Sequence, residues 1–379
     1  MDTSPGWDKI DISEIYDLLA KVDDFYQARE NPKLNVLWLV NLWLKRLRND
    51  LDYYVNCEGQ KGYGKSNLML LLSILQARYS GIWENNYTKK RYRVLARTRP
   101  LPKDYTHIEC GFQFTRNMSF LDDAKGVKLK YNSLDRYQPF VIDEGSKVLH
   151  KHRWMDLMQY ELVRLSDTSR YQNKTFLVCF PHFSELNAAF RNDRIMMRLY
   201  VYHRDVNNHY ADCIISLKDL NRYVPDPWHT DDNAKAYEEI LKRTPPSLRN
   251  HTHVLYAEKK LKGYAGHFEF PELRIISPHI WSIYERYKKE NAKRDETTIE
   301  GEEEKESERI LKWKWASRHL VDWIVQKHPE MTYSEIAKVM GIATLTLTQV
   351  RTLKEPTPII MRETEKMVSK LNSGQPVSS

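Results

Sequence analysis

The residues best suited to chemistry form a glycine-rich loop at positions 59–66, with the sequence Gly-Gln-Lys-Gly-Tyr-Gly-Lys-Ser. It is a complete G-x-x-x-x-G-K-[ST] pattern, and it lies between a β-leaning run at 52–57 and a strongly helical run at 67–75. Glycine backbones adopt conformations in which successive N–H groups converge on phosphate oxygens. The pattern therefore predicts a phosphate-binding loop between a strand and a helix.

This loop predicts a site for ATP with Mg²⁺. Lys65 is expected to reach the β- and γ-phosphates, and Ser66 to offer its hydroxyl to Mg²⁺. The positive end of the following helix would face the phosphates. The expected nucleotide contacts are Gly59, Gln60, Lys61, Gly62, Tyr63, Gly64, Lys65, Ser66 and Asn67.

A second motif ends the short apolar run 140–142, where Asp143 and Glu144 are adjacent. Such a run is typical of a buried parallel strand whose carboxyl end opens on a ligand crevice. Asp143 is expected to hold Mg²⁺ through a water, and Glu144 to polarise the water that attacks the γ-phosphate. An isolated acid pair is more often a capped strand end, but this one follows a complete phosphate loop by about 80 residues.

Together, the loop 59–66 and the pair Asp143-Glu144 resemble the RecA-like ATPases with an added catalytic glutamate. Within them, the chain resembles the DNA-pumping branch typified by FtsK and HerA and by related virus and plasmid ATPases. The resemblance covers about residues 46 to 220. It implies an α/β fold, with a RecA-like P-loop NTPase core built on a mainly parallel sheet, and hydrolysis of ATP. In that branch a polar residue after the next strand senses the γ-phosphate, and His182, after the apolar run 175–180, is the nearest candidate.

Motor ATPases of this type usually act as rings, so the resemblance also implies a homo-oligomer. In such rings one subunit lends an arginine to its neighbour's γ-phosphate, where a guanidinium stabilises charge on the transferring phosphoryl group. Arg191 and Arg194 follow the apolar run 175–180 and are the preferred candidates. The alternative for either side chain is an ordinary surface salt bridge.

The C-terminal region has the spacing of a helix-turn-helix over residues 332–350. Ala337 is the small residue where two helices approach, and Gly341 supplies the left-handed turn between them. The second helix is expected to expose side chains that can meet DNA bases or phosphates, namely Thr346, Thr348, Gln349 and Arg351. The alternative is a small helical bundle used for protein contacts.

The charge distribution also favours a polyanionic partner. The net charge is +8, and basic residues crowd the segment from Lys89 to Lys103. Four aromatic residues are interleaved with or flank them: Trp83, Tyr87, Tyr92 and Tyr105. Basic side chains for phosphates and rings for bases are the components of single-stranded DNA grooves. The alternative is a solvated basic insertion.

The chain divides by composition into five parts. We expect an N-terminal helical segment at 1–45, the ATPase core at 46–222, a helical extension of the core at 223–292, an acidic linker at 293–308 and a small all-α helix-turn-helix domain at 309–379. The linker has almost no apolar side chains and cannot bury a face of its own.

The remaining features predict a cytoplasmic protein. The apolar run 34–44 is too short to span a bilayer, and no signal peptide precedes it. The cysteines at 57, 110, 179 and 213 show no C-x-x-C spacing and are expected to be buried, reduced thiols.

These features favour an ATP-hydrolysing, DNA-associated motor or remodelling ATPase. The resemblance implies a virus or plasmid setting, such as genome packaging, replication or segregation. One alternative is a transcriptional regulator whose P-loop domain switches oligomeric state with nucleotide. Another is a nucleotide kinase-like transferase, against which Glu144 and the helix-turn-helix both argue.

Overall fold

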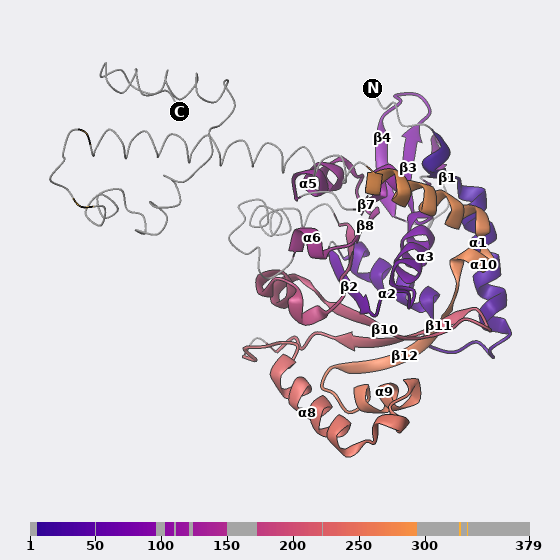
Figure 1. Cartoon of the computed structure of the whole chain (residues 1–379). Coiled ribbons are helices and arrows are strands. Elements are labelled where there is room, and N and C mark those ends of the chain that lie inside the picture. The colour runs from indigo at the N-terminus through magenta and orange to yellow at the C-terminus, as the bar shows by residue number, and fades with distance from the viewer. Residues whose placement is uncertain are drawn as a thin grey trace. The chain divides into compact units, whose positions relative to one another are not determined.

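The structure is a computed structural model of the whole chain (Figure 1). It divides into two compact units, Met1–Ala292 and Lys293–Ser379. The predicted helix-turn-helix lies outside the described residues apart from Thr332, as do Cys110 and the acidic linker beyond Lys293. The structure describes residues 6–49, 51–95, 103–109, 111–120, 124–149, 173–221 and 223–293, together with residues 326 and 332.

A seven-stranded sheet forms the centre of the first unit, in the order β12-β11-β10-β2-β9-β8-β7. The five strands from β10 to β7 are parallel, and β11 and β12 are added antiparallel at the edge next to β10. A mainly parallel sheet is confirmed, and its order is compatible with a RecA-like core. The strands are β2 (Tyr53–Gly59), β7 (Met118–Phe120), β8 (Pro139–Asp143), β9 (Thr175–Cys179), β10 (Met197–Asp205), β11 (Tyr210–Leu217) and β12 (Tyr264–Pro271).

The central strands are apolar because both faces of the sheet are covered. Every residue of β2, β8 and β9 is buried, which is the pattern of parallel strands between two layers. Helix α3 (Lys65–Ala77) packs against β8 and β9, and its residues from Asn67 to Ala77 are all buried. A helix that is buried on all sides needs a further layer outside it.

That outer layer is the N-terminal helical pair α1 (Ile12–Gln27) and α2 (Val36–Arg48), both of which contact α3. The side chain of Asn35 caps α2 by accepting a hydrogen bond from the Trp38 N–H at 2.8 Å. Most of the apolar run 34–44 thus forms helix α2, which buries one face and extends to Arg48, past the predicted boundary at 45. Its side chains belong to the same hydrophobic cluster as those of α3 and β2.

The description of residues 223–292 as a helical extension needs correction. This region does contain α8 (Thr230–Arg243), α9 (His251–Glu258), α10 (Leu273–Ile276) and a helix at 278–293. However, β12 lies among them and pairs with β11 as the edge strand of the main sheet. Its alternating buried residues Gly266, Phe268 and Phe270 face the core, so the region belongs to that core.

The basic segment Lys89–Lys103 belongs to a separate three-stranded sheet of order β4-β3-β5, as far as it is described. The strands are β3 (Ser80–Asn85), β4 (Arg91–Leu95) and β5 (Tyr105–Glu109). Part of the positive charge is paired within the chain: Arg91 bonds Glu84 at 2.6 Å, and Arg93 bonds Asp135. These pairs reduce the charge left for a polyanion.

Short elements complete the described part of the first unit. Strand β1 (Lys9–Ile10) pairs with β6 (Phe112–Gln113), and three short helices follow: α4 (Phe114–Asn117), α5 (Ala124–Ser133) and α6 (Ser146–Leu149). Within this part, no helix is long and apolar enough to cross a membrane. Cys57, Cys179 and Cys213 are buried free thiols, as predicted.

A buried lysine lies just before β9. Lys174 is 1% exposed, and its Nζ donates a hydrogen bond to the carbonyl oxygen of Tyr131 at 2.5 Å. Burial lowers the pKa of Lys174 to about 8, although the nearby Asp52 carboxylate opposes the shift. The folded chain therefore holds the Lys174 proton less tightly than the unfolded chain does.

This difference predicts a pH-dependent stability. Between pH 8 and the ordinary lysine pKa of 10.5, the unfolded chain binds more protons, so wild-type stability rises with pH. We expect the free energy of unfolding of wild type, relative to Lys174→Met, to increase by about 2 to 3 kcal/mol between pH 7 and pH 10.5. Urea unfolding at several pH values measures it, with the exposed Lys289→Met as control. If the difference in unfolding free energy between wild type and Lys174→Met did not change with pH, the prediction would be wrong.

Candidate nucleotide-binding site

The phosphate loop connects β2 to α3, as the sequence predicts. Its glycines are required for different structural reasons. Gly59, Gly62 and Gly64 all have positive φ, at 144°, 86° and 106°. Gly64 is the residue before α3 and has the left-handed conformation. A Cβ on Gly59 would lie 2.3 Å from the carbonyl oxygen of Val201 on β10, whereas a Cβ on Gly62 would meet nothing within 4 Å. Close approach of two strands therefore requires Gly59, and backbone conformation alone requires Gly62.

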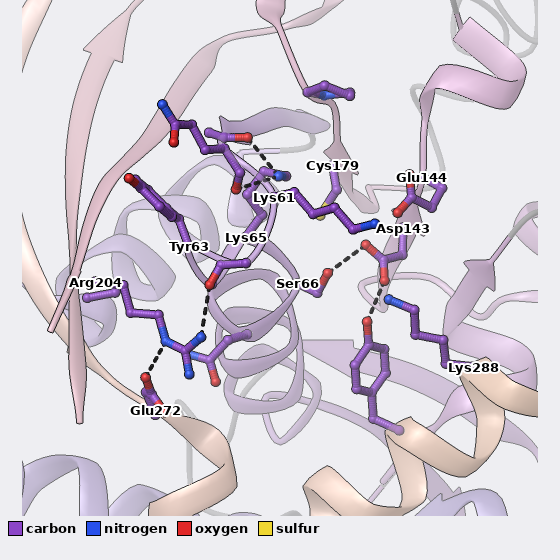
Figure 2. A pocket seen from close by; sticks show the side chains of 18 of the residues that line it. Lys61, Tyr63, Lys65, Ser66, Asp143, Glu144, Cys179, Arg204, Glu272 and Lys288 are labelled. Atoms are coloured by element: carbon purple, nitrogen blue, oxygen red, sulfur yellow. Dashed lines mark hydrogen bonds and ion pairs between the residues drawn. The ribbon is translucent and has the colours of Figure 1, made fainter. Parts of the chain in front are cut away.

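The side chains of Ser66 and Asp143 meet at the centre of the site (Figure 2). Ser66 Oγ donates a hydrogen bond to Asp143 Oδ1 at 2.8 Å, although the two residues are 77 positions apart. Ser66 lies in the first turn of α3, and Asp143 is the last residue of β8. The structure thus brings together the two residues that the sequence assigns to Mg²⁺.

The other oxygen of Asp143 is also engaged. The hydroxyl of Tyr284, on helix 278–293, donates to Asp143 Oδ2 at 2.6 Å. Burial raises the pKa of Tyr284 far above its usual range, and the adjacent Asp143 carboxylate raises it further. Tyr284 therefore stays protonated and acts as a donor that fixes the Asp143 carboxylate in place.

Lys65 lies over the phosphate loop. Its Nζ donates to the carbonyl oxygens of Gly59 at 2.7 Å and Gln60 at 3.1 Å. Figure 2 shows these two bonds, with the Lys65 side chain folded back over the loop. The ammonium group is thus held against the backbone of the phosphate loop.

Glu144 has a strained backbone. Its φ is +62°, and its side chain is exposed. A non-glycine residue in this region costs about 1 to 2 kcal/mol. The next residue, Gly145, packs so closely on β9 that no side chain fits there. A Cβ on Gly145 would lie 2.4 Å from a methyl group of Val178. The N–H of Gly145 also donates to the carbonyl oxygen of Cys179 at 2.8 Å. The tight fit of Gly145 against β9 directs Glu144 into the site.

These residues surround a cavity of about 850 Å³, a size typical of ligand sites. His182 lies on its rim and is exposed. The residues assigned from sequence that line the cavity are Gly59, Gln60, Lys61, Gly62, Tyr63, Gly64, Lys65, Ser66, Asn67, Asp143, Glu144 and His182.

The side chain of Asn67, however, has a structural partner. Its Nδ2 donates to the carbonyl oxygen of Pro271 at 3.0 Å, and its Oδ1 accepts from the Leu273 N–H at 2.6 Å. These bonds tie α3 to the end of β12 and to α10. The amide side chain of Asn67 is therefore engaged in holding the fold.

Arg191 and Arg194 lie away from the cavity and do not line it. Both are on a π-helical turn at Phe190–Arg194. The Nε of Arg191 donates to Asn192 Oδ1 at 3.1 Å, and its guanidinium carbon lies 6.0 Å from the ring centre of Phe183. A role in a neighbouring subunit's site stays a prediction.

One wall of the cavity was not predicted from sequence. Arg204, at the end of β10, donates to the carbonyl oxygen of Gly62 at 3.0 Å and to Glu272 at 2.5 Å. Arg274 donates to the other oxygen of Glu272 at 2.5 Å. Burial by itself would raise the pKa of Glu272, but the hydrogen bonds from Arg204 and Arg274 outweigh it and lower the pKa. This ion cluster fixes the phosphate loop to the antiparallel edge of the sheet.

The donor set of the site fits Mg²⁺. Mg²⁺ usually takes one or two protein oxygens and completes its shell with water and phosphate oxygens. The Ser66 hydroxyl and the Asp143 carboxylate are oxygen ligands of that kind. No cluster of three or more His, Cys, Asp or Glu side chains able to hold a metal is found in the described part of the chain.

Comparisons with known proteins add little to this picture. No family model matches the sequence, and the search of curated proteins gave no match either. Among solved structures, the N-terminal domain of zonular occludens toxin from Neisseria meningitidis matches 44% of this chain and 83% of its own length. The identity is 12% and the TM-score 0.23, too low to support an argument. The mostly parallel sheet, with a glycine-rich loop between β2 and α3, is compatible with a RecA-like core.

The loop geometry predicts different effects for two glycine substitutions. Gly59→Ala forces a methyl group against the Val201 carbonyl, so we expect a loss of about 3 kcal/mol in unfolding free energy. Gly62→Ala has open space and only backbone strain, so we expect a loss of about 1 to 2 kcal/mol. Urea unfolding without nucleotide gives both values. Equal losses of unfolding free energy for the two variants would show that the close contact between Gly59 and β10 adds nothing to the effect of backbone strain.

Proposed function

We propose that this protein hydrolyses ATP in a Mg²⁺-dependent reaction. The observation that carries the proposal is the 2.8 Å contact between Ser66 and Asp143, with Glu144 next in sequence and facing the same cavity as the phosphate loop. Phosphoryl transfer depends on positioning and charge compensation more than on covalent chemistry. The site has groups for both tasks.

Each residue has a distinct task in this reaction. The loop N–H groups and Lys65 bind the phosphates, and Ser66 and Asp143 hold Mg²⁺, which supplies positive charge to the transferring phosphoryl group. Glu144 positions and polarises the attacking water. Its exposed side chain lies beside the metal-binding carboxylate without a hydrogen bond to it among the described residues, so it is available for a water.

Two variants separate binding from chemistry. Glu144→Gln keeps Asp143 and the loop, so it is expected to bind Mg-ATP while its hydrolysis rate falls by about a hundredfold or more. Lys65→Ala is expected to lose nucleotide binding while keeping the fold, because within the chain Lys65 Nζ bonds only two carbonyl oxygens of the loop, whereas the phosphates need its charge. Fluorescent-nucleotide binding, steady-state ATPase rates and thermal unfolding of both variants measure these effects.

For each variant, one result would contradict the proposal. Normal hydrolysis by Lys65→Ala would remove the proposed nucleotide site. A loss of less than about tenfold for Glu144→Gln would show that Glu144 is not the base. The exposed Lys289→Ala serves as a surface control for purification and folding.

We further propose that the ATPase acts on DNA as a motor or remodelling enzyme of a virus or plasmid, in a homo-oligomeric ring. The support is the helix-turn-helix spacing at 332–350 and the net charge of +8. In such a ring, Arg191 or Arg194 would complete a neighbour's site. Because Arg91 and Arg93 are paired with acids, we place the main DNA contact on Thr346, Thr348, Gln349 and Arg351 and a secondary one on the segment Lys89–Lys103.

Two substitutions in the full-length protein test the DNA contact. Arg351→Glu is expected to weaken duplex binding. It is also expected to reduce the slope of log affinity against log salt concentration by about one unit, because one phosphate contact is lost. Gln349→Ala is expected to relax sequence preference while most non-specific affinity remains. Duplex titrations at two salt concentrations, with the solution mass of each variant, measure both effects.

The same titrations distinguish the alternatives. Unchanged DNA affinity with altered mass would assign the C-terminal region to assembly. Tight, sequence-specific binding with very slow ATP turnover would instead favour a nucleotide-switched transcriptional regulator.

A further inference from the structure

Helix 278–293 presents one face to the nucleotide cavity. Four of its side chains line the cavity, at the spacing of successive helical turns: Trp281, Tyr284, Glu285 and Lys288. Tyr284 is fixed by its hydrogen bond to Asp143. Lys288 lies one turn further along the helix, on the same face.

Lys288 has an environment suited to binding an anion. Its ammonium nitrogen lies 5.1 Å from the ring centre of Phe120 and 5.9 Å from that of Tyr284. No carboxylate or hydrogen-bond partner of Lys288 is found among the described residues. Rings attract a cation only weakly, and although Lys288 points toward Asp143 (Figure 2), it has no bonded anion among the described residues. An incoming phosphate would supply the missing negative charge.

Most other cations of the cavity are already engaged. Lys65 is bonded to loop carbonyl oxygens, and Arg204 and Arg274 share the carboxylate of Glu272. Lys61 lies on the phosphate loop itself and is exposed. Among the lining cations described, Lys288 is thus the one that approaches the phosphates from outside the loop and the Glu272 cluster.

The position of Lys288 indicates which phosphate it would meet. Figure 2 shows its side chain pointing toward Asp143, with Glu144 nearby, whereas Tyr63 and Arg204 lie at the other end of the cavity. Asp143 and Glu144 mark the place of the metal and the attacking water, and therefore of the last phosphate in the chain. We propose that Lys288 binds the terminal phosphate of a nucleoside triphosphate and so lets helix 278–293 distinguish triphosphate from diphosphate. The inference rests on the proposed nucleotide function.

Equilibrium binding to the full-length protein tests it. The ligands are a non-hydrolysable ATP analogue and ADP, each with Mg²⁺, and the variants are Lys288→Ala, Lys288→Gln and Lys288→Arg. Lys289→Ala is the matched control, because Lys289 is exposed, adjacent in sequence and outside the cavity lining. We expect Lys288→Ala and Lys288→Gln to lose about tenfold or more in affinity for the triphosphate analogue, and less than about threefold for ADP. Lys288→Arg should retain most of the discrimination, because it keeps the charge.

Three results would overturn the inference. Lys288→Ala and Lys288→Gln could behave as Lys289→Ala does, or they could lose affinity for ADP and for the triphosphate analogue equally. In either case wild-type binding stays intact, and only the role of Lys288 fails. If folded wild-type protein binds neither nucleotide, the proposed function fails as well. Thermal unfolding of each variant shows whether a loss of nucleotide affinity is caused by unfolding of the protein.

Discussion

The carboxylate of Asp143 is the point on which the site depends. Its two oxygens accept hydrogen bonds from Ser66 and Tyr284 at 2.8 and 2.6 Å, and these donors come from opposite ends of the first unit's sequence. The pair of bonds connects the first turn of α3, the end of β8 and helix 278–293. A buried carboxylate is costly unless both oxygens are satisfied, so these three elements must fold together for the site to exist.

The sheet supplies the rigidity that this arrangement needs. Glu58, buried in β2 directly before the phosphate loop, accepts hydrogen bonds from Arg198 on β10 and from the N–H of Phe183, just past His182. Burial tends to lower the pKa of Arg198, but Glu58 and Glu258 outweigh that effect and raise it. This charged network ties the end of β2 to β10 and to the segment after β9. The loop and the segment after β9 therefore keep a fixed separation.

Local sequence patterns were sufficient for the part of the site that short segments form. The glycine pattern specified the loop, and an apolar run ending in Asp143 specified the opposing strand, because both signals lie within a few residues. Tyr284 and Lys288 carry no such signal, since they reach the site only through contacts more than a hundred positions long, such as the 141 positions that separate Tyr284 from Asp143. The edge strand β12 alternates between exposed and buried residues from Ala265 to Phe268, but the prediction from sequence for the whole of 223–292 is a helical extension.

Helix 278–293 has a mechanical consequence. It is held at the Asp143 carboxylate by Tyr284, and it runs without interruption to Lys293, the first residue of the second unit. At 1.5 Å per residue, the distance from Tyr284 to Lys293 along the axis is about 13 Å. A tilt of about 10° around Tyr284 would displace Lys293 by about 2 Å, by simple lever geometry. Any tilt of helix 278–293 about Tyr284 would therefore also move Lys293.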